Sequence, residues 1–322
     1  MSRITLFISL LAILISSFTP LPCSGEGHYD IPLKPFENSH FVRVDSITIH
    51  YRIWNEQALH PKGKVILIHG FCGSTFSWRN NFDTLVKAGY KVVAVDLPGF
   101  GYSMRSPRLN QSQSYRAYLI WGLLKTIDGA DSSRWNIVGH SMGGGTAEAM
   151  ALMKPEKTQS LTIVDGMIFI TNDNILLPVE GLTNHPIYRR ILLNYTEKSY
   201  LSFNKFRREL KSTYGFLPDT ATVNGYLIPL LIDGTAETVV NILSNAREIQ
   251  TFHASGLKRL PVLVIWGKKD HTIRLKNGKR LKRTVPSIEL KVIPTAYHMP
   301  METHVSVFNQ LLVEFLDRNN TQ

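Results

Sequence analysis

Cysteine and acidic residues are both scarce in this chain of 322 residues. It has two cysteines, Cys23 and Cys72, which are too few for a disulfide framework or a cysteine-rich zinc domain. Asp and Glu total 25 against 36 Lys and Arg, so the formal net charge is +11. With 43% hydrophobic and 19% charged residues, the composition excludes a wholly disordered or collagen-like chain.

Several cofactor and nucleic-acid signatures are also missing. The sequence has no G-x-x-x-x-G-K-[ST] phosphate loop and no His/Cys cluster with zinc spacing. It has no recognised nucleic-acid module, and its basic residues are not interleaved with aromatics. We therefore expect no cofactor, no metal and no nucleic-acid partner. The oligomeric state is left open.

The first 25 residues have the pattern of a secretory signal peptide. Arg3 precedes an apolar run from Ile4 to Ile15, and a proline-containing stretch ends in small residues at Gly25. We predict cleavage near Gly25 and export to a periplasmic or extracellular location. The alternative is an N-terminal membrane anchor, but the run breaks at Ser16, short of the roughly 20 apolar residues that a span needs. Three N-glycosylation sequons lie at Asn110, Asn194 and Asn319.

Short apolar runs alternate with segments of helical length, which predicts a mostly parallel α/β sheet flanked by helices. The expected strands are Ile47–Ile53, Lys64–Ile68, Lys91–Val95, Trp135–Val138, Leu161–Val164, Val262–Trp266 and Ile288–Ile293. The expected helices are Phe76–Ala88, Ser114–Ile127, Met142–Met153, Ile273–Thr284 and Val305–Arg318. Residues 41–44 and 47–54 are expected to form an antiparallel hairpin that turns at Asp45 and Ser46.

The 95 residues between Asp165 and Pro261 lack a convincing core strand. Their helix-like patches are Ile187–Asn194, Tyr200–Leu210 and Thr235–Ala246. We predict a helical cap (166–255) inserted into one core domain made of residues 26–165 and 256–322.

The clearest motif is Gly139-His140-Ser141-Met142-Gly143, between the expected strand ending at Val138 and a helix rich in small residues. A turn tight enough to expose a serine hydroxyl strains the backbone, and flanking glycines allow it. The following helix N-terminus points its amides at a developing oxyanion. Ser141 is therefore the candidate nucleophile.

With His69-Gly70-Phe71 and the turn Asp96–Ser103, this motif makes the chain resemble the α/β-hydrolase superfamily of serine esterases and lipases, including monoacylglycerol-lipase-like enzymes. The resemblance implies an α/β-hydrolase fold. It also implies that the backbone amides of Phe71 and Met142 form the oxyanion hole. His69 is interpreted as a structural residue that braces its loop.

The resemblance also implies the chain order nucleophile, acid, base. His298 follows the last expected strand and is the predicted base, in preference to His304 and His271. Asp270 lies in Trp-Gly-Lys-Lys-Asp just beyond a strand and is the predicted acid. Asp165 is the alternative acid because some family members place it after the preceding strand. Asp96 is expected to be a structural turn carboxylate.

The serine in the turn Gly139–Gly143, the nucleophile elbow, and the expected export favour a carboxylic-ester hydrolase. Such an esterase or lipase would act through an acyl-enzyme on a small-molecule or lipid ester. Two alternatives remain: a carbon–carbon bond hydrolase of the ring-cleavage type, and a non-catalytic binding protein on this fold. Basic residues are dense in 189–211 and 268–283. These basic segments make an anionic membrane surface a candidate partner. A basic surface that is simply exposed to solvent explains the same residues equally well.

Overall fold

The computed structural model describes residues 31–168, 185–244 and 252–320. The predicted signal peptide or anchor, its cleavage site and Cys23 lie outside these ranges, so export remains a prediction. Among the described helices, none combines the length and the apolar character that crossing a bilayer requires.

The core is an eight-stranded sheet with the order β1-β2-β4-β3-β5-β6-β7-β8. β1 and β2 are antiparallel, β2 runs antiparallel to β4, and every later neighbour is parallel, which confirms the predicted fold class. The strand bounds are β1 Ser39–Val44, β2 Ile47–Trp54, β3 Gly63–Ile68, β4 Tyr90–Val95, β5 Trp135–His140, β6 Thr158–Val164, β7 Val262–Gly267 and β8 Glu289–Ile293. The hairpin turns at Asp45 (φ 53°) and Ser46, as predicted.

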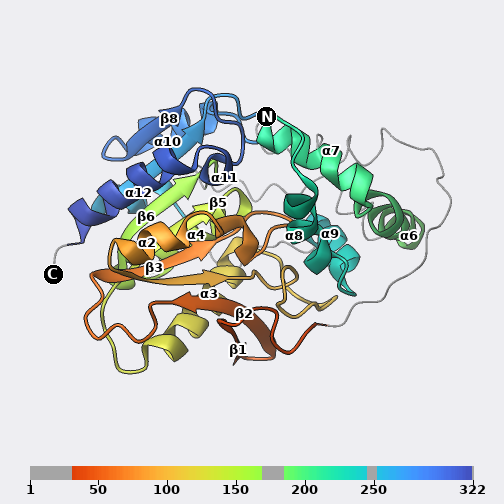
Figure 1. Cartoon of the computed structure of the whole chain (residues 1–322), viewed down its shortest axis with the longest axis horizontal. Helices are drawn as coiled ribbons and strands as arrows, with labels where there is room; N and C mark the ends of the chain where they lie inside the picture. Colours follow the sequence, from red (N-terminus) through yellow and green to blue (C-terminus); the bar gives the residue numbers. More distant parts are fainter. Residues whose placement is uncertain (1–30, 169–184, 245–251, 321–322) are drawn as a thin grey trace.

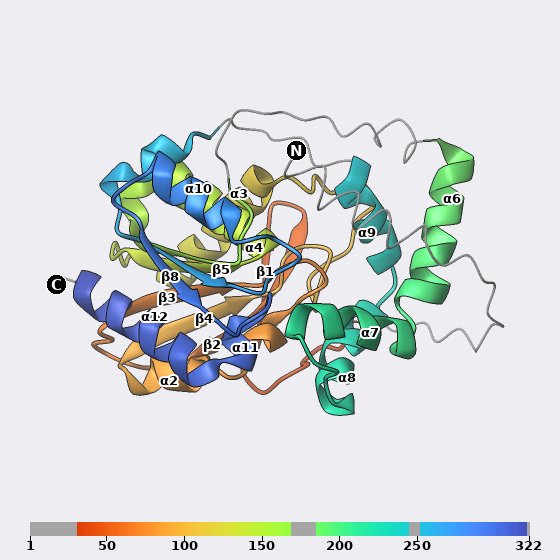
Figure 2. The same ribbon diagram turned by 90° about the horizontal axis from the view of Figure 1, so that it is seen from above.

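Helices cover both faces of this sheet (Figure 2). α3 (Gln113–Asp128), α4 (Met142–Met153) and α10 (Lys276–Thr284) lie on one face. α2 (Phe82–Lys87) and α12 (Val305–Asn319) lie on the other, next to the short α11 (Pro300–Thr303). β3, β5 and β6 are almost entirely buried, which explains their continuous apolar sequences.

The predicted helix over 76–88 is instead a short 3-10 turn, η1 (Thr75–Trp78), followed by α2. Two buried polar contacts flank the break. The amide of Thr75 donates to the carboxylate of Asp96 (2.6 Å), and Asn81 donates to the carbonyl of Met301 (3.0 Å). Both hydrogen bonds join residues far apart in the chain, so local propensity does not reveal them.

Between β6 and β7 the described residues form several helices, of which α6 to α9 lie beyond the carboxyl ends of the strands (Figure 1) while η4 leads into the amino end of β7. They are α6 (Pro186–Tyr195), the π-helical segment η3 (Thr196–Tyr200), α7 (Phe203–Tyr214), α8 (Thr220–Leu230), α9 (Thr235–Ser244) and the 3-10 segment η4 (Ala254–Arg259). We call α6 to α9 the cap. The sequence analysis missed α8, which begins at an Asp219 side-chain cap and contains Pro229 near its end.

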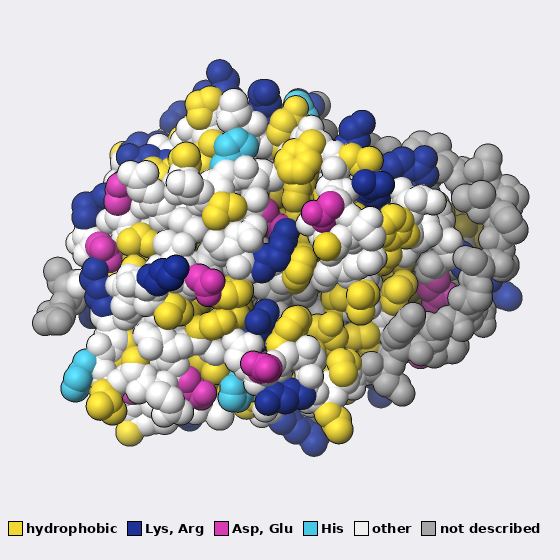
Figure 3. All heavy atoms as spheres, in the orientation of Figure 1, with side chains coloured by type: hydrophobic (Ala, Val, Ile, Leu, Met, Phe, Trp, Pro, Cys, Tyr) yellow, Lys and Arg dark blue, Asp and Glu magenta, His cyan; other side chains and the backbone are white. Residues whose placement is uncertain are grey.

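Basic side chains are spread over the face shown in Figure 3, with acidic ones between them. On the cap, Arg189 donates to Asn241 (2.8 Å) and Arg207 donates to the carbonyl of Pro218 (2.9 Å). These arginines thus have structural partners within the cap. Binding to an anionic membrane stays a prediction.

Candidate active site

Ser141 lies in a strained turn between β5 and α4. Its backbone has φ 53° and ψ −120°, a region that costs a non-glycine residue roughly 1–3 kcal/mol. The flanking residues must be glycines because a side chain at either position would collide with the backbone. A Cβ on Gly139 would lie 2.2 Å from the carbonyl oxygen of Gly143, and one on Gly143 would lie 2.3 Å from that of His69. This is the geometry that the glycine spacing predicts.

The loop after β3 lies directly against this turn. A Cβ on Gly70 would be 2.9 Å from the Cβ of Ser141. Phe71 is the next residue in the chain and is therefore also close to this turn. Met142, on the other side of the serine, is the first residue of α4. Both predicted oxyanion amides therefore belong to segments adjacent to Ser141, and their role remains a proposal.

His69 holds that loop in place. Its Nε2 accepts a hydrogen bond from the amide of Leu97 (2.8 Å), and its Nδ1 lies 2.7 Å from the carbonyl oxygen of Gly70. Burial lowers the pKa of His69 to about 4, so the ring is neutral at pH 7 and Nδ1–H donates to Gly70. The side chain braces the loop and does not reach Ser141 by a hydrogen bond.

The predicted base and nucleophile meet. His298 Nε2 lies 2.9 Å from Ser141 Oγ, although 157 residues separate them in the chain. The carbonyl of His298 accepts a hydrogen bond from His140 Nε2 (2.8 Å). Burial and the nearby His298 lower the pKa of His140 well below its usual value, so its ring is a neutral donor. His140 thus fixes the backbone that carries the base.

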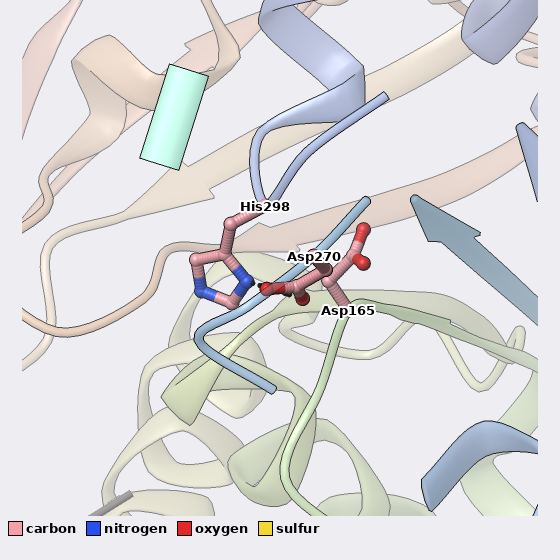
Figure 4. Close-up of side chains that lie close together, drawn as sticks. All are labelled: Asp165, Asp270 and His298. Carbon is pink, nitrogen blue, oxygen red and sulfur yellow. Dashed lines mark hydrogen bonds and ion pairs between the residues drawn. The ribbon is translucent and has the colours of Figure 1, made fainter. Parts of the chain in front are cut away.

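The predicted acid completes the series. Asp270 Oδ2 lies 2.7 Å from His298 Nδ1 (Figure 4), and Asp270 Oδ1 accepts hydrogen bonds from the amides of Thr272 (2.7 Å) and Ile273 (3.0 Å). α10 begins at Lys276 and not at Ile273 as predicted. A carboxylate with fixed donors holds Nδ1–H toward itself and leaves Nε2 free to accept the serine proton.

Backbone contacts join the loops that carry the acid and the base. The amide of Lys269 donates to the carbonyl of Ala296 (2.9 Å). Gly267 lies beneath the base loop, and a Cβ there would be 2.0 Å from the carbonyl oxygen of Tyr297. Gly267 of the Trp-Gly-x-x-Asp sequence must therefore be a glycine, because the acid loop and the base loop cross there without room for a side chain.

The alternative acid, Asp165, follows β6 and is also close. Ligand atoms of Asp165, Asp270 and His298 lie within 4.8 Å of one another. His298 Nδ1, however, is hydrogen-bonded to Asp270 and not to Asp165. Burial and the charge of Asp270 raise the pKa of Asp165 well above its usual value.

The other candidates have structural partners. His304 caps α12 and hydrogen-bonds with Thr295 (2.9 Å), and His271 is exposed and contacts the ring of Tyr297. Asp96 accepts from His50 Nδ1 (2.7 Å) and from two backbone amides. Burial opposes ionisation of Asp96, but His50, His69 and the amide of Tyr102 together outweigh it and lower the pKa of this carboxyl.

The sequence analysis missed a link between the cap and the base loop. The carboxyl of Glu302, on α11, is fully buried and accepts hydrogen bonds from Tyr214 and Tyr226 of the cap and from Arg79 of the core. Nothing in the local sequence marks these residues, because 76 to 223 positions separate the partners.

A serine hydroxyl, an imidazole and a carboxylate in hydrogen-bonded series can activate the serine as a nucleophile. Placed at the carboxyl edge of a mostly parallel sheet, this arrangement defines the class: the protein is a hydrolase of the α/β type. The chain belongs to the alpha/beta hydrolase fold family, whose model matches residues 64–305.

Relatives and solved structures agree on the fold and differ in activity. A 2-hydroxy-6-oxononadienedioate/2-hydroxy-6-oxononatrienedioate hydrolase from Pseudomonas putida is 28% identical over 87% of this chain and 97% of the relative. A meta-cleavage product hydrolase from Pseudomonas fluorescens IP01 has a TM-score of 0.64 at 22% identity, covering 87% of this chain and 97% of that one. A thermophilic esterase from Thermogutta terrifontis has a TM-score of 0.68 at 19% identity, covering 88% and 99%.

The predicted carboxylic-ester hydrolase function is wrong, whereas export stays a prediction. Curated relatives from several bacteria are hydrolases of 2-hydroxy-6-oxononadienedioate, which agrees with the carbon–carbon alternative. The error has a physical reason. Ester and carbon–carbon hydrolases on this fold can share the serine elbow, so the motifs on which the prediction rested do not distinguish the bond that is cleaved.

Proposed function

We propose that this hydrolase cleaves the carbon–carbon bond beside the ketone of a 2-hydroxy-6-oxodienoic acid. The observation that carries the proposal is the similarity to hydrolases of 2-hydroxy-6-oxononadienedioate over 97% of a relative's length. The complete Ser141–His298–Asp270 series supports it, because this chemistry needs a nucleophile and a group that returns the proton.

In the first step His298 takes the proton of Ser141 while Ser141 attacks the ketone carbon C6. The amides of Phe71 and Met142 stabilise the oxyanion, and Asp270 stabilises the imidazolium. The substrate reacts as its 2,6-dioxo tautomer, in which the hydroxyl proton has moved to C5. This tautomer supplies an electron sink, since the C2 ketone is conjugated with the C3–C4 double bond.

In the second step the C6 carbonyl re-forms and the C5–C6 bond breaks. The electron pair passes through the conjugated system to the C2 oxygen, which takes the proton from His298 and leaves as a 2-hydroxydienoate. Water activated by His298 then attacks the acyl group on Ser141, and a carboxylic acid is released. The net reaction consumes one water and needs no oxidant or reductant.

The test compares 2-hydroxy-6-oxononadienedioate with p-nitrophenyl butyrate on the same preparation. Cleavage is followed by loss of the conjugated chromophore and by mass spectrometry of both products, with Ser141→Ala as the control. We expect a higher kcat/KM for the dienedioate and no cleavage by Ser141→Ala. Faster turnover of the ester, or an intact dienedioate, contradicts the proposal.

A further inference from the structure

Two carboxyl groups are buried together behind His298. Asp165 follows β6 and is fully buried, while Asp270 follows β7 and is only 4% exposed. Figure 4 shows both side chains at the site, with Asp270 between Asp165 and the imidazole. The hydrogen-bonded series uses only one of these two carboxyl groups, so the other is unexplained.

The surrounding donors distinguish the two groups. Asp270 accepts hydrogen bonds at both oxygens, from His298 and from the amides of Thr272 and Ile273. Asp165 Oδ1 accepts from the amide of Gly267 (2.9 Å). Asp165 Oδ2 is buried, and no donor within the described residues reaches it.

The neighbour of Asp165 is itself an acceptor. A carboxyl oxygen of Asp270 lies within 4.8 Å of one of Asp165, and the two groups can share a hydrogen bond only if one of them carries a proton. Two charged carboxylates at this separation in a buried site repel each other strongly. Asp270 has three donors aimed at it, so Asp165 is the group that holds the proton.

We propose that Asp165 is a positioning residue, a neutral carboxylic acid whose Oδ2–H donates to Asp270 and holds that carboxylate against His298. The pair then carries one negative charge and not two. Asp270 and His298 are the titratable groups that face Asp165 among the described residues. The part that concerns catalysis rests on the proposed role of Asp270, whereas the protonation of Asp165 does not.

Backbone geometry determines which substitutions are informative. Asp165 has φ 43°, a left-handed conformation that Asn and Gly tolerate far better than branched or bulky residues. Asp165→Asn keeps an acceptor for Gly267 and a donor for Asp270. Asp165→Gly removes both without adding backbone strain, so the two variants form a matched pair.

Protonation is tested directly by infrared spectroscopy at neutral pH. We expect the wild-type protein to show the carbonyl stretch of a buried carboxylic acid, and Asp165→Asn to lack it. If the band is absent from the wild-type protein, or persists unchanged in folded Asp165→Asn, the proposal is overturned. This measurement does not depend on any substrate.

Positioning is tested by the rate at which a fluorophosphonate labels Ser141 across a pH series. We expect Asp165→Gly to lower the rate by roughly tenfold or more through misplacement of Asp270, and Asp165→Asn to restore most of that loss. The acid-side midpoint should stay unchanged in Asp165→Asn. If Asp165 were ionised, removing its charge would move that midpoint to lower pH. That shift, or full labelling of Asp165→Gly, overturns the proposal, and neither depends on whether the substrate is a diketone.

Discussion

The backbone amide of His298 donates a hydrogen bond to the carbonyl oxygen of Thr213, 2.9 Å away, so a cap residue helps to hold the loop that carries the base. Thr213 lies at the end of α7, and the next residue, Tyr214, donates to the buried carboxyl of Glu302. The cap is therefore part of the framework that positions the imidazole, and its effects on activity extend beyond contacts with substrate.

Tyr214→Phe is expected to weaken this framework. It removes a hydrogen bond to the buried carboxyl of Glu302 and should lower the free energy of unfolding by about 1–3 kcal/mol. The rate at which a fluorophosphonate labels Ser141 should fall as well. Urea unfolding and labelling kinetics measure the two effects. Tyr188→Phe, at an exposed position on α6, is the control, and equal behaviour of the two variants would contradict the prediction.

Substitutions of Ser141 should reveal the strain in its backbone. Ala retains the penalty of φ 53°, whereas Gly adopts this region readily. We expect Ser141→Gly to be more stable than Ser141→Ala by about 1 kcal/mol or more, with neither variant labelled by a fluorophosphonate. Chemical denaturation of the two variants in parallel provides the comparison. Equal stabilities would mean that the turn relaxes without the serine.

Gly267→Ala is expected to separate the acid loop from the base loop. Its Cβ would be 2.0 Å from the carbonyl oxygen of Tyr297, so the backbone must move. Overpacking of this kind costs about 1–3 kcal/mol, and labelling of Ser141 should fall sharply. Gly145→Ala, within α4, is the matched control for stability because its nearest contact would be 3.3 Å from a side chain, that of Gln113, and not 2.0 Å from backbone. A stable, fully reactive Gly267→Ala would refute this account of the loop crossing.

Stability should depend on pH through Asp165. The pKa of this carboxyl is raised in the folded protein, by burial first and by Asp270 second, so the folded state keeps a proton that the unfolded state loses above about pH 4. Stability from this group is complete below that pH and declines as pH rises toward the folded pKa, by up to about 1.4 kcal/mol per pH unit.

Asp165→Asn removes this titration. The variant should gain stability relative to the wild-type protein as pH rises from 4, as measured by denaturation at a series of pH values. Asp83→Asn, at an exposed position on α2, is the control. A constant difference between Asp165→Asn and wild type at every pH would show that Asp165 titrates alike in both states.

Local sequence patterns predicted the parts of the fold that local forces determine. The helix from Met142 to Met153 has the predicted bounds, and the serine, acid and base predicted from the sequence lie within hydrogen-bonding distance of one another in series. Their loops follow buried strands whose apolar runs are easy to recognise. The catalytic roles of these residues still await the experiments above.

Long-range contacts were beyond such prediction. Asn81, which precedes α2, binds partners more than 200 residues away, and Glu302 accepts hydrogen bonds from two cap tyrosines that no sequence motif identifies. α8 was missed because Gly225 and Pro229 suggest a loop, yet Gly225 allows the helix to approach the ring of Phe76. The bond that is cleaved could not be inferred, since the shared elbow carries no information about it.

The central sheet has one more consequence, for how new specificities can arise on this scaffold. Ile68 of β3 pairs with Gly139 of β5, so the predicted oxyanion loop and the nucleophile turn leave adjacent strands at a spacing that backbone hydrogen bonds set. The cap is inserted after β6 and takes no part in that pairing. Exchange of cap segments that keeps the contacts of Thr213 and Tyr214 can therefore change which molecule is admitted without altering this strand pairing, so recognition can evolve separately from the spacing of the two turns.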